Sequence, residues 1–385
     1  MIPIAAVDLD PLRDRLAGLG RAPTPADVAT AMRAEGRMVS DAALIETVEA
    51  LRRHSVGAGP LEDLLRSPGV TDILVNGPDQ IYVDRGAGLE LTGLRFADDG
   101  QVRRLAQRLA ASVGRRLDDA APFVDARLAD GSRLHAVLAP LSDPGTCISL
   151  RVLGQRTFSL DDCLRSGALH PGGAELLRRM VAARLAFLIS GGTGSGKTTL
   201  LGALLGLVPP DERIVIVEDS RELDPAHPHV VRLEARPANA ERSGAVTLTD
   251  LVRQSLRMRP DRLVVGEVRG REICDLLTAL NTGHEGGCGT VHANSAADVP
   301  ARLEALAALG GLDRNAVHAQ VTSALHAVVH VSRDEAGLRR VSEISVLTRA
   351  ATTGLVHTER AVLFTADGRV ERGPGGPQLE GLLDR

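Results

Sequence analysis

Residues 185–199 read LAFLISGGTGSGKTT, an apolar run that passes directly into a glycine-rich loop. Leu185–Ser190 has the length and character of a buried strand, and Lys197–Leu207 has the character of a helix. The loop between them matches G-x-x-x-x-G-K-[ST], in which backbone N–H groups and the start of a helix bind phosphate. The stretch therefore predicts the beginning of an α/β domain with a phosphate-binding loop. The loop residues are Gly191, Gly192, Thr193, Gly194, Ser195, Gly196, Lys197, Thr198 and Thr199.

Lysine is almost absent from this sequence, because Lys197 is the one lysine among 45 lysines and arginines. A composition that favours arginine elsewhere indicates that a compact ammonium is required at Lys197. In loops of this kind the lysine reaches the β- and γ-phosphate oxygens, and the hydroxyl of Thr198 binds Mg²⁺. The alternative is a glycine-rich turn with an accidental Lys-Thr, which the flanking strand and helix disfavour.

The composition describes a globular chain, with 44% apolar and 24% charged residues among 385. Such a chain can form two or three hydrophobic cores, which excludes a disordered chain and a disulfide-stapled miniprotein. The central apolar stretch Leu200–Val208 is far shorter than the roughly 20 residues of a membrane span. The opening residues MIPIAAVDLD lack the pattern of a secretory signal, so we expect a cytoplasmic protein. The net charge of −4 disfavours a nucleic-acid partner.

The first part of the chain divides into three segments. Apolar residues at helical spacing in residues 1–58 predict a helical extension. Residues 59–153 carry short strands around the turn signals Asn76-Gly77 and Asp130-Gly131, with one helical segment between them, and predict an α+β domain. Residues 154–174 contain several glycines and a proline and are expected to form a linker.

The second part contains an α/β domain and a tail. In residues 175–350, β-branched runs such as Ile214–Val217 and Leu263–Val265 alternate with helical segments, which predicts central parallel strands. Residues 351–385 are rich in glycine and threonine, and only Arg360–Phe364 resembles a strand. We expect this tail to have no assignable function.

Carboxylates end two of the expected central strands. Glu218 and Asp219 follow one strand, and Glu267 ends the next. In open α/β sheets the carboxyl ends of the strands form the crevice that binds ligands, so these groups are expected to face the metal and the attacking water. Glu218 and Glu267 are candidate Mg²⁺ ligands together with Thr198, and candidate catalytic acids. The alternative for Glu218 and Asp219 is an acidic turn, and for Glu267 a solvated strand end.

Two histidines and several arginines complete the candidate site. His284 and His292 lie eight residues apart, and a histidine near the terminal phosphate can change hydrogen-bond partner when the phosphate leaves. They could also be structural, or bind zinc together with Cys288. Hydrolysis of a terminal phosphate often requires an arginine from another domain or subunit. Arg133 and Arg151, on the strands of the α+β domain, are the candidates, although most of the arginines must be ordinary surface charge.

Four motifs in order give the chain a family resemblance. GGTGSGKTT, IVIVEDSREL, LRMRPDRLVVGEVRG and NTGHEGGCGTVHAN resemble the ATPases of the type II/type IV secretion superfamily, and the resemblance extends from Gly59 to Arg349. It is greatest to the tight-adherence (Flp-type) pilus branch, including its conjugal-transfer-associated actinobacterial members. One departure is Gly287-Cys288-Gly289, where the family pattern has a serine and bulkier residues.

The resemblance implies a RecA-like motor domain that binds ATP and Mg²⁺, preceded by a smaller PAS-like α+β domain that closes over the nucleotide. It assigns Glu218 and Asp219 to an acidic box, Glu267 to the Walker B position, and His284 and His292 to a histidine box. It further implies a homo-hexamer at the inner face of the cell membrane, where it acts on a membrane-embedded platform protein.

These expectations lead to a motor ATPase that powers pilus assembly, secretion or conjugation. A nucleic-acid translocase with the same core remains the alternative, which stimulation by single-stranded DNA would reveal. A regulatory GTPase is excluded, because its base-reading Asn-Lys-x-Asp motif needs a second lysine. A non-hydrolysing ATP-binding scaffold would lack catalytic acids, whereas Glu218 and Glu267 are both present.

Overall fold

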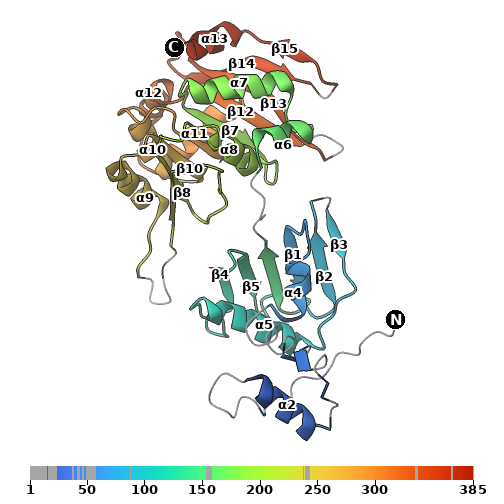
Figure 1. Ribbon diagram of the computed structural model, residues 1–385. Helices are drawn as coiled ribbons and strands as arrows, with labels where there is room; N and C mark the ends of the chain where they lie inside the picture. The colour runs from blue at the N-terminus through green and yellow to red at the C-terminus, as the bar shows by residue number, and fades with distance from the viewer. Residues whose placement is uncertain are drawn as a thin grey trace. The chain divides into compact units, whose positions relative to one another are not determined.

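The chain forms two compact units, Met1–Gly154 and Gln155–Arg385 (Figure 1). Their structure comes from a computed structural model. The residues it describes are 15, 24–36, 39–40, 44–45, 47–48, 58–86, 88–152, 158–236, 238, 243–333, 337–365 and 367–384.

The smaller unit is built around a six-stranded antiparallel sheet in the order β3-β2-β1-β6-β5-β4. The hairpins expected at Asn76-Gly77 and Asp130-Gly131 are confirmed, with left-handed φ angles at both glycines. The helix α5 packs against the sheet and buries its apolar face in the core of this unit. The elements are α2 (Pro25–Ala34), η1 (Gly59–Leu61), α4 (Glu62–Leu65), β1 (Asp72–Asn76), β2 (Gln80–Asp84), β3 (Leu89–Leu91), α5 (Asp99–Ser112), β4 (Phe123–Arg127), β5 (Arg133–Val137) and β6 (Cys147–Arg151).

The amino-terminal segment contains one well-defined helix among its described residues, α2. It begins at Pro25 after the N-cap Thr24, whose side chain forms a capping box with Asp27. Val28 and Met32 form a small cluster on its apolar face. The expected helical character of residues 1–58 is confirmed for this stretch, and the other residues of that segment lie mostly outside the described residues.

The larger unit contains a nine-stranded mixed sheet in the order β15-β14-β13-β12-β7-β11-β10-β8-β9. The six strands from β12 to β9 are parallel, and β13, β14 and β15 are antiparallel additions. The elements are α6 (Leu160–Arg165), α7 (Pro171–Ala182), β7 (Phe187–Gly191), α8 (Lys197–Leu205), β8 (Ile214–Glu218), β9 (Val230–Glu234), α9 (Leu248–Ser255), η2 (Leu256–Met258), β10 (Arg262–Val268), α10 (Glu272–Leu280), β11 (Cys288–His292), α11 (Val299–Ala308), α12 (Arg314–Ala324), β12 (Ala327–Arg333), β13 (Arg339–Arg349), β14 (Val356–Phe364), β15 (Val370–Arg372) and α13 (Gly376–Leu383).

Helices cover both faces of this sheet, as Figure 1 shows. The helices α6, α7, α8 and α13 share one hydrophobic core with the sheet, and α9 to α12 share the other. The central strands β7 and β8 are buried at every position. This burial explains their continuous apolar runs, because a strand covered on both faces has no polar side.

The structure corrects two expectations about this unit. The expected linker 154–174 includes α6 and the start of α7, and Leu160 and Cys163 are buried in the core. The expected tail 351–385 contains β14, β15 and α13, which extend the sheet and cover one face. The expected parallel pairing of the central strands is confirmed, and the strands that follow β12 are antiparallel because they return by short connections.

None of the helices in the described part of the chain is both long enough and apolar enough to cross a membrane.

Candidate active site

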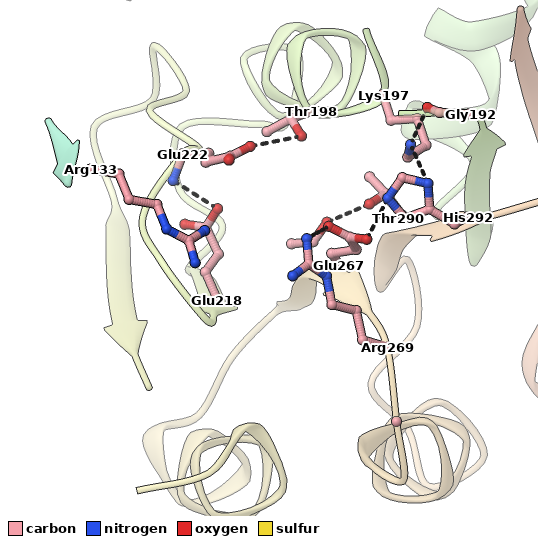
Figure 2. A network of polar contacts seen from close by, with 12 residues as sticks. Arg133, Gly192, Lys197, Thr198, Glu218, Glu222, Glu267, Arg269, Thr290 and His292 are labelled. Atoms are coloured by element: carbon pink, nitrogen blue, oxygen red, sulfur yellow. Dashed lines mark hydrogen bonds and ion pairs between the residues drawn. The ribbon is translucent and has the colours of Figure 1, made fainter. Parts of the chain in front are cut away.

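Most of the candidate residues of the larger unit gather at one edge of its sheet. The strands β7, β11, β10 and β8 are parallel neighbours, so their carboxyl ends meet at the same edge. The glycine-rich loop follows β7, Glu218 ends β8, Glu267 lies near the end of β10, and His292 ends β11. Lys197 and His292, 95 positions apart in the chain, are in contact there (Figure 2).

The loop that precedes α8 adopts backbone conformations that require glycine. The φ angles are +153° at Gly191, +67° at Gly194 and +97° at Gly196. A Cβ on Gly191 would lie 2.2 Å from the carbonyl oxygen of Val331, so no side chain fits there. The hydroxyl of Ser195 is buried and has no hydrogen-bond partner among the residues that the structure describes. A phosphate oxygen would satisfy this hydroxyl, so the loop fits a phosphate-bearing ligand.

The ammonium of Lys197 points back into its own loop. Nζ donates to the carbonyl oxygens of Gly191 at 3.0 Å and Gly192 at 2.7 Å. The residue is 6% exposed, and burial lowers the pKa of its amine. Charged phosphate oxygens are stronger acceptors than neutral carbonyls, so a phosphate would compete well for the same three protons.

The neighbours of His292 determine its tautomer. An ammonium can only donate, so Nδ1 of His292, 3.4 Å from Nζ of Lys197, acts as an acceptor. Nε2 therefore carries the hydrogen, and it lies 2.7 Å from Oε1 of Glu267. Burial, and next the charge of Lys197, lower the pKa of His292 and keep the ring neutral. His292 thus connects the loop lysine to the carboxylate of Glu267.

The two carboxylate oxygens of Glu267 differ in their contacts. Oε2 accepts from Nη2 of Arg269 at 2.5 Å, whereas Oε1 lies 2.7 Å from Nε2 of His292 but is buried without a hydrogen-bond partner among the described residues. Burial acts to raise the pKa of Glu267, but the hydrogen bond and charge of Arg269, together with the charge of Lys197, outweigh it, so the pKa is lowered. An ionised carboxylate in this position can accept a proton or orient a water molecule.

Glu218 is directed towards the backbone of its own turn. It is 4% exposed, and Oε1 accepts the N–H groups of Glu222 and Leu223, each at 3.0 Å. Burial raises the pKa of Glu218 to about 7, against the lowering effect of these two hydrogen bonds. A Cβ on Gly266 would lie 2.5 Å from Cγ of Glu218, so this glycine leaves the space that the side chain fills. Asp219, which follows, is exposed.

The carboxylate in contact with Thr198 belongs to Glu222. The hydroxyl of Thr198 donates to Oε2 of Glu222 at 3.3 Å (Figure 2). Hydroxyl and carboxylate oxygens are the ligands that Mg²⁺ prefers, and it usually completes its shell with phosphate oxygens and water. Thr198 and Glu222 therefore fit a magnesium site beside the loop.

Arg333 supports the loop from a neighbouring strand. Nε and Nη2 of this residue, which ends β12, donate to the carbonyl oxygen of Gly194 at 3.1 and 2.9 Å. The pairing joins the outermost turn of the loop to the β12–β13 hairpin, and it limits how far that turn can move.

His284 lies at the other end of β11 from His292. It is in the turn between α10 and β11, where its Nδ1 is 3.3 Å from the carbonyl oxygen of Ala279. The five residues of β11 span roughly 13 Å at the rise of an extended strand. Within one chain, His284 is therefore too far from the phosphate-binding loop to lie beside the same terminal phosphate as His292. The expectation is wrong for His284.

The two candidate arginines lie on the sheet of the smaller unit. Arg133 begins β5 and pairs with Asp125 at 2.7 Å, and Arg151 ends β6 beside it. Arg151 is exposed. Their role in catalysis stays a prediction.

A zinc site at His284, Cys288 and His292 does not match the chemistry of these residues. Burial raises the pKa of the Cys288 thiol to about 12, whereas zinc binds the thiolate. In the described ranges, no three His, Cys, Asp or Glu side chains are grouped as a metal site requires.

Sequence reasoning missed three residues that contact this site. Glu222 lies four residues after Glu218 in the same acidic stretch, and Arg269 lies two residues after Glu267. Both positions could therefore have been predicted from the sequence. Arg333 is 139 positions from Gly194. Only the three-dimensional arrangement brings these two together, and no sequence signal indicated it.

A strand that enters a glycine loop and a helix, with a buried lysine facing an acidic strand end, defines the class of P-loop proteins. The comparison with known families specifies the class further. The profile described as "Type II/IV secretion system protein" matches residues 54–360, and the chain belongs to this family. The resemblance recognised in the four sequence motifs is thereby confirmed.

Relatives of this chain have names from transfer and secretion systems. A protein of Mycobacterium tuberculosis with a provisional conjugal-transfer name is 57% identical over 319 residues, which cover 81% of this chain and 91% of the relative. The type IV secretion system protein PtlH of Bordetella pertussis is 38% identical over 261 residues, which cover 61% of this chain and 76% of that protein.

Two solved structures share the fold. The ATPase DotB of Legionella pneumophila aligns with a TM-score of 0.52 at 18% identity, over 75% of this chain and 80% of DotB. The pilus retraction motor PilT, solved with bound ADP, aligns with a TM-score of 0.50 at 21% identity, over 78% of this chain and 81% of PilT. The chain thus has an α/β fold similar to these two proteins.

Proposed function

We propose that this protein is an ATPase whose hydrolysis cycle powers a transport machine of the conjugation, secretion or pilus-assembly kind. The family membership, the conjugal-transfer name of the 57% identical relative and the type IV secretion name of PtlH support the transport role. A RecA-like core for the larger unit agrees with its parallel central strands and its phosphate-binding loop.

One observation carries the enzymatic part of the proposal. Lys197, His292, Glu267 and Arg269 form a continuous series of polar contacts between the phosphate-binding loop and an ionised carboxylate. Binding of phosphate alone requires the loop backbone and the lysine. It does not require a neutral histidine between that lysine and a carboxylate. Such a series allows the occupancy of the loop to alter the position of Glu267.

The residues then have distinct roles. The backbone of the loop and Lys197 would bind the β- and γ-phosphates of ATP, and Glu267 would orient and deprotonate the attacking water. Mg²⁺ bound by Thr198 and Glu222 would neutralise charge on the phosphates. Glu218 would support this metal site, because it holds the turn that presents Glu222. When Lys197 moves to a phosphate, Nδ1 of His292 becomes available for a new donor.

The assembly is part of the same proposal. We infer a homo-hexamer that lies at the cytoplasmic face of the inner membrane and acts on a membrane-embedded platform protein. Arg133 and Arg151 are candidates for stabilising charge on the transferred phosphoryl group, which an arginine from another domain or subunit can do. Measuring the mass of the purified protein in solution, with and without ATP, tests the hexamer directly.

The decisive experiment compares steady-state ATP hydrolysis by the parent with that of Glu267→Gln. We expect the variant to bind ATP about as well as the parent and to hydrolyse it at least ~100-fold more slowly, because it loses the base and keeps the phosphate contacts. Glu380→Gln is a matched control, since Glu380 is a half-buried glutamate of α13 that pairs at 2.9 Å with Arg179, near the end of α7 that leads into the start of β7. Equal turnover by parent and Glu267→Gln would contradict the proposal.

The same assay separates the transport motor from a nucleic-acid translocase. Single-stranded DNA added at low salt would stimulate a translocase, because phosphate contacts dominate such binding. We expect no stimulation of this protein, whose net charge is −4.

A further inference from the structure

The strand that carries Glu267 contains a β-bulge at that residue. On β10, Val265 pairs with Gly289 of β11, and Val268 pairs with Val291. Two residues, Gly266 and Glu267, therefore lie opposite the single residue Thr290. A bulge of this kind bends the strand and changes the direction of the side chain that it carries.

The burial of the neighbouring valines confirms this geometry. Side chains alternate along a regular strand, so residues three positions apart point to opposite faces. Val265 and Val268 nevertheless both lie in the core beneath α9 to α12, whereas Val264 lies in the other core. The extra residue in the bulge resets the alternation, and Glu267 is directed to the contacts with His292 and Arg269.

A buried hydroxyl fixes the bulge from the adjacent strand. Oγ1 of Thr290 donates to the carbonyl oxygen of Gly266 at 2.7 Å, and Thr290 is 1% exposed (Figure 2). Gly266 is held from its other side by Glu218, whose Cγ leaves no space for a Cβ. Gly266 has no partner in the register of the two strands, and the Thr290 hydroxyl gives its carbonyl oxygen a buried hydrogen-bond donor.

We propose that Thr290 is a positioning residue for the hydrolysis reaction: its hydroxyl holds the Gly266 carbonyl in the bulge and so sets the place of the Glu267 carboxylate. Thr290 does not itself contact the nucleotide. The inference rests on the proposed function, because it assigns Thr290 a role in the ATPase reaction. A displacement of about 1 Å in a reacting group can reduce a rate ~100-fold, so loss of this single bond should be visible in turnover.

The test compares Thr290→Val with Thr290→Ser in the full-length protein. Valine keeps the branched shape and removes the donor, whereas serine keeps the donor and removes a methyl group. We expect Thr290→Val to lower kcat at least ~10-fold with KM for ATP and affinity for ADP within ~2-fold of the parent. Thr290→Ser should keep most of the parent's kcat. Equal kcat for Val and parent, or equal loss for Val and Ser, would overturn the inference.

Ser255→Ala serves as a matched control for stability. Ser255 is also fully buried and donates through its hydroxyl to a carbonyl oxygen, that of Val252 at 2.6 Å, but it lies at the end of α9. The control should lose thermal stability to a similar degree as Thr290→Val and keep the parent's kcat. If the control loses kcat to the same degree, Thr290 acts through the stability of the fold and the inference fails.

A double-mutant comparison shows whether Thr290 acts through Glu267. In the Glu267→Gln protein, adding Thr290→Val should lower the residual turnover by less than ~2-fold, because the carboxylate that the bulge positions is already gone. If Thr290→Val lowers turnover by the same factor in the Glu267→Gln protein as in the parent, the inference is overturned. An inactive parent would instead contradict the proposed function, so the two failures are distinguishable.

Discussion

The buried carboxyl of Glu218 makes the stability of the protein depend on pH. Its pKa is about 7 in the folded chain and 4.5 in an unfolded one, so the folded state binds more protons between these values. The contribution of this group to stability therefore falls as pH rises from about 4.5 to about 7, and it stays lost above that range. The full difference is roughly 3 kcal/mol.

We expect Glu218→Gln to remove this dependence, since the amide keeps the acceptor for the N–H groups of Glu222 and Leu223. Relative to the parent, the variant should gain melting temperature between pH 5.5 and pH 8 in buffer free of nucleotide and divalent metal. A constant difference in melting temperature between the two proteins across this range would show that the carboxyl titrates normally.

Lys197→Arg should abolish ATP turnover even though it keeps the positive charge. The ammonium is 6% exposed and lies between two loop carbonyls and His292, and a planar guanidinium does not fit a space shaped for a compact group. The measurement is single-turnover hydrolysis with saturating ATP. Near-normal turnover would mean that the bias towards arginine, rather than the chemistry of the loop, explains why lysine occurs once in the sequence.

Residues with a strong local pattern could be predicted from the sequence, and those placed by tertiary contacts could not. The loop motif predicted Lys197 and Thr198 because its spacing determines its backbone. Glu267 followed from its position at the end of an apolar run. The contact of Arg333 with the loop could not be predicted, because nothing near Arg333 in the sequence indicates that it donates to the carbonyl oxygen of Gly194. His284 was misplaced, because spacing along the chain does not indicate at which end of a strand a residue lies.

At the scale of elements, α13 belongs to the core of the larger unit. Leu379 is 1% exposed in the core that α6, α7 and α8 share, and Arg179 of α7 pairs with Glu380 at 2.9 Å. Leu379→Ala should lower the free energy of unfolding by about 2–4 kcal/mol, because it leaves a cavity at a site that is covered on all sides. Chemical denaturation of the larger unit measures this loss. Leu309→Ala, at a leucine that is 69% exposed, should change it by less than ~0.5 kcal/mol.

The two elements that sequence analysis mistook for a linker and a tail have weak local signals. The helix α6 has six residues, too few for an apolar period, and its capping box pairs Ser159 with Asp162 rather than with a glutamate or glutamine. Arg360–Phe364, the second half of β14, was predicted as a strand and is confirmed, whereas the first half begins Val-His-Thr-Glu, with one apolar residue, and was not predicted. Packing against the sheet, rather than intrinsic propensity, stabilises both elements.

At the scale of the whole molecule, the chain separates the phosphate-binding loop and the candidate arginines into different units. We expect Arg133→Ala and Arg151→Ala to lower kcat while ADP affinity stays within ~2-fold, because an arginine of this kind acts on charge that develops at the γ-phosphate. Arg85→Ala, which breaks an exposed pair with Glu90 in the same unit, should leave kcat unchanged. Loss of ADP affinity in step with kcat would assign the two arginines to nucleotide binding instead.

A fragment that contains only Gln155–Arg385 extends this test. The fragment retains the whole nine-stranded sheet and both of its cores. It should bind ADP and hydrolyse ATP poorly, since both candidate arginines are missing. Full activity of the fragment would show that Arg133 and Arg151 are not required for hydrolysis. If that activity did not depend on protein concentration, a ring of subunits would not be required either.

The single lysine has a consequence for covalent chemistry. Across 385 residues, Lys197 provides the one side-chain primary amine, and it lies inside the phosphate-binding loop. An acylating reagent that labels amines therefore has two kinds of target, that side-chain amine and the α-amine of the chain. A phosphate ligand that occupies the loop would shield the side-chain amine from the reagent. The ratio of the two labelled peptides in a mass spectrum then reports the fraction of subunits with an occupied loop, without any engineered probe.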